Sequence, residues 1–190
     1  QWQDVCAKAL LHAPRSERDA RDWLERHLRP YRVEPLKNGG PGLITGYYEP
    51  QLDARRRASG DFQVPLYAPP ADLESRRPYW TRREIDTLPA ARAAMRGREI
   101  AYVADPLDAL ALQIQGSGRV RVTEPDGSVR NVRLAYAANN GQPYASVGRW
   151  LIDQGELLPG QASWPAIRAW AHRNPSRVNA LLWSNPRYVF

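Results

Sequence analysis

Two polar segments near the middle of the chain carry side chains that could recognise a ligand rich in hydroxyl and amide groups. They span residues 115–118 and 136–141, and apolar segments flank both of them. In the first, Gln115 and Ser117 can each donate and accept hydrogen bonds, and its glycines let a ligand approach the backbone closely. The same glycines also suit a helix end followed by a turn, and residues 139–141 also suit a plain turn. Ligand contact and simple chain reversal are therefore both open for these segments.

A third segment, residues 46–50, places a carboxyl group directly after two tyrosines. We favour a structural role for Glu49, such as pairing with an arginine, over contact with a ligand. Tyrosines at 47, 48, 136 and 144 could stack on sugar faces, although aromatic side chains more often form a core or the wall of a groove. The candidate ligand contacts are Tyr47, Tyr48, Glu49, Gln115, Gly116, Ser117, Gly118, Tyr136, Asn139, Asn140 and Gly141.

The remaining acidic residues do not form a recognisable catalytic pair. A glycosidase normally uses two carboxyl groups that face one cleft, and the sequence alone does not reveal such a pair. Asp105 precedes a proline and suits a helix cap, Asp126 suits a turn, and Asp153 suits the surface of a helix. We therefore assign none of them a catalytic role.

Metal and cofactor chemistry are not predicted. The three histidines lie far apart and lack the paired spacing of a zinc site, and Cys6 is the single cysteine. No nucleophile elbow, dinucleotide-binding pattern or P-loop is present. Cys6 is interpreted as a buried residue on a helix, with a bridge to a cysteine upstream of Gln1 as the alternative.

Composition predicts a folded globular protein with a basic surface. The chain has 190 residues, 43% of them hydrophobic, with seven tryptophans and a net charge of +7. We interpret the charge as a solvated surface. An anionic partner is the alternative, either one that carries carboxylates or nucleic acid, and no RNA-binding signature supports the latter. No apolar run is long enough for a membrane helix, so any export signal or lipid anchor is expected before Gln1.

Hydrophobic periodicity and turn residues predict both helices and strands. Two helices open the chain, the second capped by Ser16. Strands are expected at 43–48 and 62–67, joined by an exposed hairpin turn over 53–60, and Pro65 favours an edge position for the second.

Further elements follow the proline-rich stretch 68–78. Thr81 and Glu84 predict a capping box, a strand follows at 100–103, and a helix runs from its cap at Asp105 to Gly116. A hairpin spans 119–134, and helices capped near Ser146, Ser163 and Asn174 precede a short strand at 188–190.

Four segments, taken together and in this order, resemble the membrane-bound lytic transglycosylase A family. They are residues 46–50, residues 115–118, residues 136–141 with 146–148 and 151–155, and residues 185–190. The opening helix around Trp2 and Cys6 is also similar.

The resemblance implies a mainly β fold with peripheral helices (α+β), in which a double-psi β-barrel carries an inserted β-rich domain across a deep groove. Residues 1–63 would be the N-terminal part of the barrel domain, and residues 64–190 the inserted domain with its return toward the barrel.

The resemblance also implies cleavage of the bond between N-acetylmuramic acid and N-acetylglucosamine, with a 1,6-anhydro product. The family's catalytic aspartate would lie beyond Phe190, so no catalytic residue is expected in this chain, which would then be inactive alone. The expected partner is the glycan strand of peptidoglycan, in the periplasm. Attachment to the outer membrane would come only from a lipid anchor absent from this chain. The alternative is a non-catalytic carbohydrate-binding module.

Overall fold

The computed structural model describes residues 2–31 and 48–190, which belong to two compact units, 1–46 and 47–190. The first unit contains helices α1 (Trp2–Leu11) and α2 (Glu17–His27). Ser16 caps α2 as predicted, since its hydroxyl accepts a hydrogen bond from the Asp19 amide at 3.1 Å. Cys6 is exposed, so the prediction of a buried cysteine was wrong. The reason is that neither helix buries any described residue within this unit.

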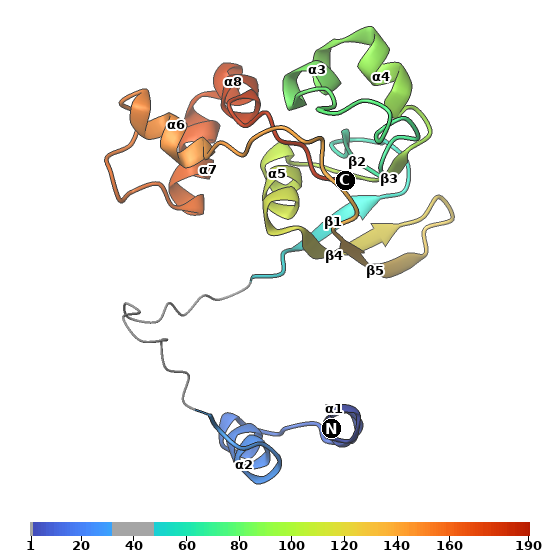
Figure 1. Ribbon diagram of the computed structural model, residues 1–190, viewed down its shortest axis with the longest axis vertical. Helices are drawn as coiled ribbons and strands as arrows, with labels where there is room; N and C mark the ends of the chain where they lie inside the picture. The colour runs from blue at the N-terminus through green and yellow to red at the C-terminus, as the bar shows by residue number, and fades with distance from the viewer. Residues whose placement is uncertain (1, 32–47) are drawn as a thin grey trace. The chain divides into compact units, whose positions relative to one another are not determined.

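The second unit is built on an open five-stranded sheet in the order β2-β3-β1-β4-β5 (Figure 1). The strands are β1 (Gln51–Arg55), β2 (Val64–Tyr67), β3 (Glu99–Val103), β4 (Ser117–Thr123) and β5 (Val129–Ala135). Strand β1 runs parallel to β4, and the other neighbouring pairs are antiparallel. Strand β2 occupies an edge, as Pro65 predicted.

The prediction of an exposed hairpin turn over 53–60 was wrong for its first residues, because Asp53 and Arg55 belong to β1. Leu52 and Ala54 alternate with them and join the buried core of the sheet. Asp53 pairs with Arg121 of β4, with Nε–Oδ1 at 2.7 Å. The polar composition of this segment therefore led us to miss a strand. Its charged residues lie on the exposed face of the sheet, and its apolar residues lie on the opposite, buried face.

The boundary expected between residues 63 and 64 falls inside this sheet. Strand β1 precedes that boundary yet pairs with β4 over five residues, from Gln51 opposite Arg119 to Arg55 opposite Thr123. The compact unit that holds the sheet begins at Tyr47 instead. The predicted strand at 43–48 falls almost entirely outside the described residues, and the assignment of the preceding residues to a barrel stays a prediction. The α+β class is confirmed, and helices take more of the described residues than strands.

Helix α5 (Pro106–Gln115) lies between the sheet and a cluster of helices (Figure 1). Leu107 and Leu110 of this helix pack against α6 (Val147–Asp153), α7 (Trp164–Arg173) and α8 (Val178–Trp183). Ala109 and Leu112 pack on the sheet beside Val120. The helix therefore buries two faces, which fixes the position of its C-terminal end.

The remaining elements follow the predicted caps. Thr81 and Glu84 form a complete capping box at α3 (Arg82–Thr87), followed by α4 (Pro89–Met95). Ser146 and Ser163 cap α6 and α7, and a 3-10 turn, η1 (Pro175–Arg177), leads into α8. The short strand predicted at 188–190 forms a single bridge between Val189 and Asn139.

Candidate functional site

The predicted loop 115–118 joins the end of α5 to the start of β4. Gly116 adopts a left-handed conformation with φ of 76°, and its amide donates to the Leu112 carbonyl at 2.9 Å, which closes the helix. Gln115 is the last residue of the helix and Ser117 the first of the strand. The loop is thus a helix end that leads into a strand, which was the alternative to ligand contact in the sequence analysis. The geometry also leaves Gln115 exposed and Ser117 half-buried, so both side chains are accessible.

This loop lines a cavity of about 900 Å3, and Tyr136 lies on the same cavity. The structure therefore brings together Gln115, Gly116, Ser117 and Tyr136 from the two predicted segments. Tyr136 and Tyr144 expose 55% and 52% of their surface, so both present an open aromatic face. The full lining is Arg82, Gln113, Ile114, Gln115, Gly116, Ser117, Ala135, Tyr136, Tyr144, Asn185, Arg187 and Val189.

Asn140 does not line this cavity, because it is fully buried and all its hydrogen bonds are internal. Its amide group donates to the carbonyls of Trp80 and Pro186, both at 2.9 Å. Its carbonyl oxygen accepts from the amides of Tyr188 at 2.9 Å and Gln142 at 3.3 Å. Asn140 therefore ties three separate segments of backbone together and has no group left for a ligand.

The neighbours of Asn140 form the turn that was the alternative to ligand contact. Asn139 accepts from the Gly141 amide at 2.8 Å and donates to the Tyr136 hydroxyl at 2.7 Å. Gly141 has φ of 73° and packs near Pro78. Neither residue lines the cavity, and Asn139 acts on it only by holding the Tyr136 ring.

Gly118 is also a packing residue. A Cβ atom added there would lie 2.3 Å from Leu112 Cδ1 and 3.0 Å from the Pro50 carbonyl oxygen. That carbonyl accepts the Arg119 amide at 2.8 Å, so it is held in place. Glycine at this position lets α5 and the residue before β1 meet β4 closely.

The segment 46–50 contributes Tyr48 and Pro50 to a second hollow. Tyr48 is 70% exposed and lines a space of about 580 Å3 with Phe62 and Trp164. Gln115 lines both this hollow and the larger cavity. Tyr47 lies outside the described residues.

Glu49 is held by two arginines, the role that we favoured for it. Its two carboxylate oxygens accept from Arg133 Nε at 2.8 Å and Arg119 Nε at 3.1 Å. Hydrogen bonds from Arg133 and then Arg119 lower the pKa of Glu49. A carboxyl group with a lowered pKa is ionised near neutral pH and is a poor proton donor.

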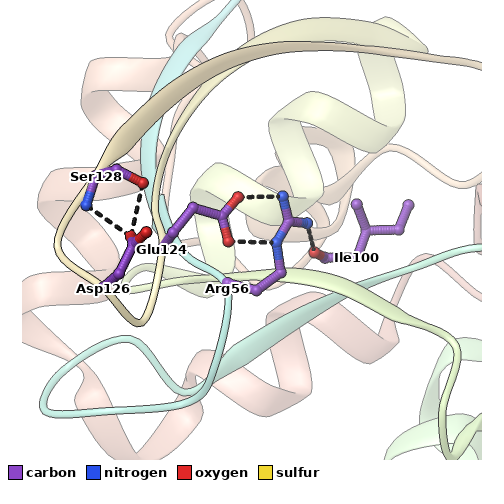
Figure 2. A network of polar contacts seen from close by, with 5 residues as sticks. All are labelled: Arg56, Ile100, Glu124, Asp126 and Ser128. Carbon is purple, nitrogen blue, oxygen red and sulfur yellow. Dashed lines mark hydrogen bonds and ion pairs between the residues drawn. The ribbon is translucent and has the colours of Figure 1, made fainter.

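Two other acidic groups near the hairpin, Glu124 and Asp126, also accept hydrogen bonds within the fold (Figure 2). Glu124 makes a two-pronged ion pair with Arg56, at 2.8 and 3.1 Å, and the hydrogen bond from Arg56 lowers the pKa of Glu124. Asp126 accepts from the amide and hydroxyl of Ser128, which closes the predicted turn and lowers its pKa. Both groups are therefore structural.

Asp105 and Asp153, the two other acidic residues with predicted roles, are also structural. Asp105 caps α5 by accepting the Leu107 amide at 2.8 Å, and it pairs with Arg168 at 2.8 Å. Asp153 is exposed on α6 and pairs with Arg149. Their predicted roles as cap and helix surface are confirmed.

Sequence analysis missed Arg82 and Gln113 as lining residues. Both are buried, and Arg82 Nη2 donates to the Gln113 side-chain oxygen at 2.7 Å. Arg187, which belongs to the segment 185–190, also lines the cavity. A single arginine at a helix start carries no sequence signal for burial, so only the fold reveals Arg82.

Within residues 2–31 and 48–190, no three His, Cys, Asp or Glu side chains lie close enough to hold a metal ion. The helices described in the same ranges are too short or too polar to cross a membrane.

Comparison with known proteins identifies the family. Residues 43–190 match the family described as the MltA specific insert domain. Membrane-bound lytic murein transglycosylase A of Escherichia coli (strain K12) is 35% identical over 173 residues, which cover 90% of this chain and 45% of that protein. The chain thus spans about half the length of this curated relative.

Solved structures agree with the sequence match. The lytic transglycosylase LtgG of Burkholderia pseudomallei is 41% identical with a TM-score of 0.71, over 100% of this chain and 55% of that one. The crystal structure of E. coli MltA with bound chitohexaose is 35% identical with a TM-score of 0.65, over 77% of this chain and 41% of that one. Because the family model matches residues 43–190 and the fold agrees with that of a solved relative, the chain belongs to the MltA family.

Proposed function

We propose that this chain forms the glycan-binding part of a peptidoglycan lytic transglycosylase. Such an enzyme cleaves the β-1,4 bond between N-acetylmuramic acid and N-acetylglucosamine and closes a 1,6-anhydro ring on the muramic acid. The observation that carries the proposal is the cavity lined by Gln115, Ser117 and Tyr136 in a chain of this family. The E. coli relative, solved with chitohexaose bound, supports a glycan as the ligand.

The chemistry of the lining suits an oligosaccharide. Gln115 and Ser117 offer both donors and acceptors, which hydroxyl and acetamido groups require. Tyr136 and Tyr144 offer exposed aromatic faces on which the apolar face of a sugar can stack. Gln115 also borders the hollow beside Tyr48 and Trp164, so a chain of several sugars can extend from one space into the other.

The reaction needs one carboxylic acid. That acid protonates the glycosidic oxygen, and as a carboxylate it then takes the proton from the 6-hydroxyl of the same sugar. Water is not the nucleophile, so the second carboxylate of a hydrolase is unnecessary. No carboxyl group lines the large cavity in the described part of the chain, and the two that line the adjoining hollow, Asp53 and Asp108, are paired with Arg121 and Arg168. We therefore expect the catalytic acid to lie outside this chain, which would then release no anhydro products by itself.

A non-catalytic carbohydrate-binding module is the second candidate. The absence of a carboxyl group from the described cavity lining favours it, because binding needs only the polar and aromatic residues. Digestion of purified murein, followed by mass spectrometry, separates the candidates. Anhydro-muropeptides from a longer protein that includes these residues, and none from residues 1–190, would support the transglycosylase. Their absence from both would favour the binding module.

Substitution of the loop residues tests the binding site itself. Gln115→Ala and Ser117→Ala should each weaken chitohexaose binding by about 0.5–1.5 kcal/mol, the net contribution of one hydrogen bond. Titration calorimetry gives the affinities. Ser128→Ala, which removes the same hydroxyl from the hairpin turn, is the matched control and should bind as the unsubstituted chain does. Unchanged affinity in both loop variants would show that the loop is only a helix end.

The family also supports a place in the cell envelope, where murein lies. We propose that the protein acts in the periplasm on glycan strands, attached to the outer membrane by a lipid anchor outside these residues. No role for nucleic acid is proposed, since the cavity groups are those suited to sugars.

A further inference from the structure

The large cavity carries an unbalanced positive charge. Arg82 and Arg187 both line it, and in the described part of the chain the lining contains no aspartate or glutamate. The polar residues that complete the lining, among them Gln113 and Asn185, are neutral. A neutral oligosaccharide does not require two guanidinium groups beside it.

Arg82 is the more constrained of the two. It is 6% exposed, and its Nε and Nη2 atoms donate to the Asn185 and Arg187 carbonyls and to the Gln113 side chain. Its guanidinium carbon lies 4.8 Å from the centre of the Tyr188 ring. Burial lowers the pKa of Arg82, and the charge of Asp86 partly opposes this shift. Among the described residues no carboxylate lies within ion-pair distance of Arg82.

Arg187 is half-buried next to it. Its Nε donates to the Gln142 carbonyl at 3.0 Å, and its own carbonyl accepts from Arg82 Nη2 at 2.9 Å. Its two terminal nitrogens donate no hydrogen bond to any residue that the structure describes. A guanidinium with its terminal nitrogens available matches the two oxygens of a carboxylate.

We propose that Arg82 and Arg187 make this cavity a site for a carboxylate carried by the glycan, so that it prefers an acidic saccharide to a neutral one. The inference rests on the proposed function, since it specifies which glycan the same cavity takes. Two parts of peptidoglycan offer this chemistry. One is the lactyl carboxyl group on the 3-oxygen of N-acetylmuramic acid, and the other is a carboxyl group of the attached peptide.

Three ligands with the same sugars separate these sources. The first is an N-acetylglucosamine–N-acetylmuramic acid oligosaccharide with a free lactyl carboxylate, and the second is its uncharged lactyl amide. The third has the lactyl group linked to the dipeptide alanyl-glutamate. We expect the free acid or the dipeptide form to bind the 190-residue chain about tenfold more tightly than the amide, the scale of one charge-assisted hydrogen bond. The tighter of the two identifies the source.

Arg187→Gln tests the proposed carboxylate site and leaves the buried Arg82 side chain in place. The ratio of acid to amide affinity should fall severalfold in Arg187→Gln and fall less in Arg187→Lys, which keeps the positive charge but loses the two-pronged match to the carboxylate. Arg173→Gln makes the same change in net charge at an exposed position at the end of α7, and it should keep the ratio of the unsubstituted chain. In that unsubstituted chain, the ratio should also shrink when salt rises from about 0.05 to about 0.5 M.

The outcomes distinguish this inference from the proposed function. Equal binding of all three ligands, or a ratio that neither salt nor Arg187→Gln changes, would overturn the carboxylate site and leave glycan binding intact. If neither these ligands nor chitohexaose bind, the proposed function fails and the carboxylate site fails with it.

Discussion

Asn140→Ala should destabilise the fold far more than the same change at its neighbour Asn139. The side chain of Asn140 makes four hydrogen bonds to backbone groups of Trp80, Gln142, Pro186 and Tyr188. It is fully buried, so truncation leaves the Trp80 carbonyl and the Gln142 and Tyr188 amides without partners, whereas the Pro186 carbonyl keeps the Arg82 amide at 3.0 Å. At about 1 kcal/mol for each bond, the expected loss is roughly 4 kcal/mol in the free energy of unfolding.

The matched change Asn139→Ala should cost less than about 1 kcal/mol, because its two bonds are exposed to water. Denaturation by urea, with the slope compared between variants, measures both changes. In a thermal scan Asn140→Ala should lower the Tm by about 8–16 °C. If Asn140→Ala lost less than about 1 kcal/mol, or if Asn139→Ala cost as much, Asn140 would not be the tie between these segments.

Two further substitutions test the packing and the electrostatics of the site's surroundings. Gly118→Ala should lower the free energy of unfolding by about 1–3 kcal/mol, because the new methyl group meets Leu112 and the Pro50 carbonyl. A free energy of unfolding in urea equal to that of the unsubstituted chain would contradict this. Glu49→Gln should change how stability depends on pH. The pKa of Glu49 is lowered in the folded chain, so its ion pairs stabilise the fold above the ordinary carboxyl pKa of about 4.3 and are lost as pH falls through the lowered value. The difference in stability between the two proteins should therefore shrink on acidification, and a difference that grew instead would refute the assigned direction.

Local sequence signals predicted most of the helices and the β4–β5 hairpin. Asp105 followed by proline, and Thr81 three residues before Glu84, mark helix starts through hydrogen bonds between neighbours in the chain. The turn at 125–127 is likewise a property of a few adjacent residues. Such signals are readable because both partners of each interaction lie within one segment.

The parallel pairing of β1 with β4 had no comparable signal. Its partners, such as Leu52 and Val120, are separated in sequence by two strands, three helices and the loops between them, so no turn residue sets their register. The charged residues of β1 were taken for a loop because their arginine partner on β4 was unknown.

Within the candidate site, residue type alone did not separate the residues that reach the cavity from those that support its walls. Gln115, Ser117 and Tyr136 reached the cavity, while Asn140 and Gly118 became internal supports of its walls. An asparagine in a turn and one buried against four backbone groups look identical in sequence. Arg82 lines the cavity although its sequence position did not indicate it, because its burial depends on hydrogen bonds to carbonyls far along the chain.

The most direct test of the account is a titration of the 190-residue chain with chitohexaose, followed by backbone amide NMR. The account predicts that the shifts cluster at residues 115–117, 136 and 144, around the cavity, and leave the exposed face of β4 and β5 at Arg121 and Asn131 unchanged. Shifts centred on that sheet face, or no shifts at saturating ligand, would contradict it.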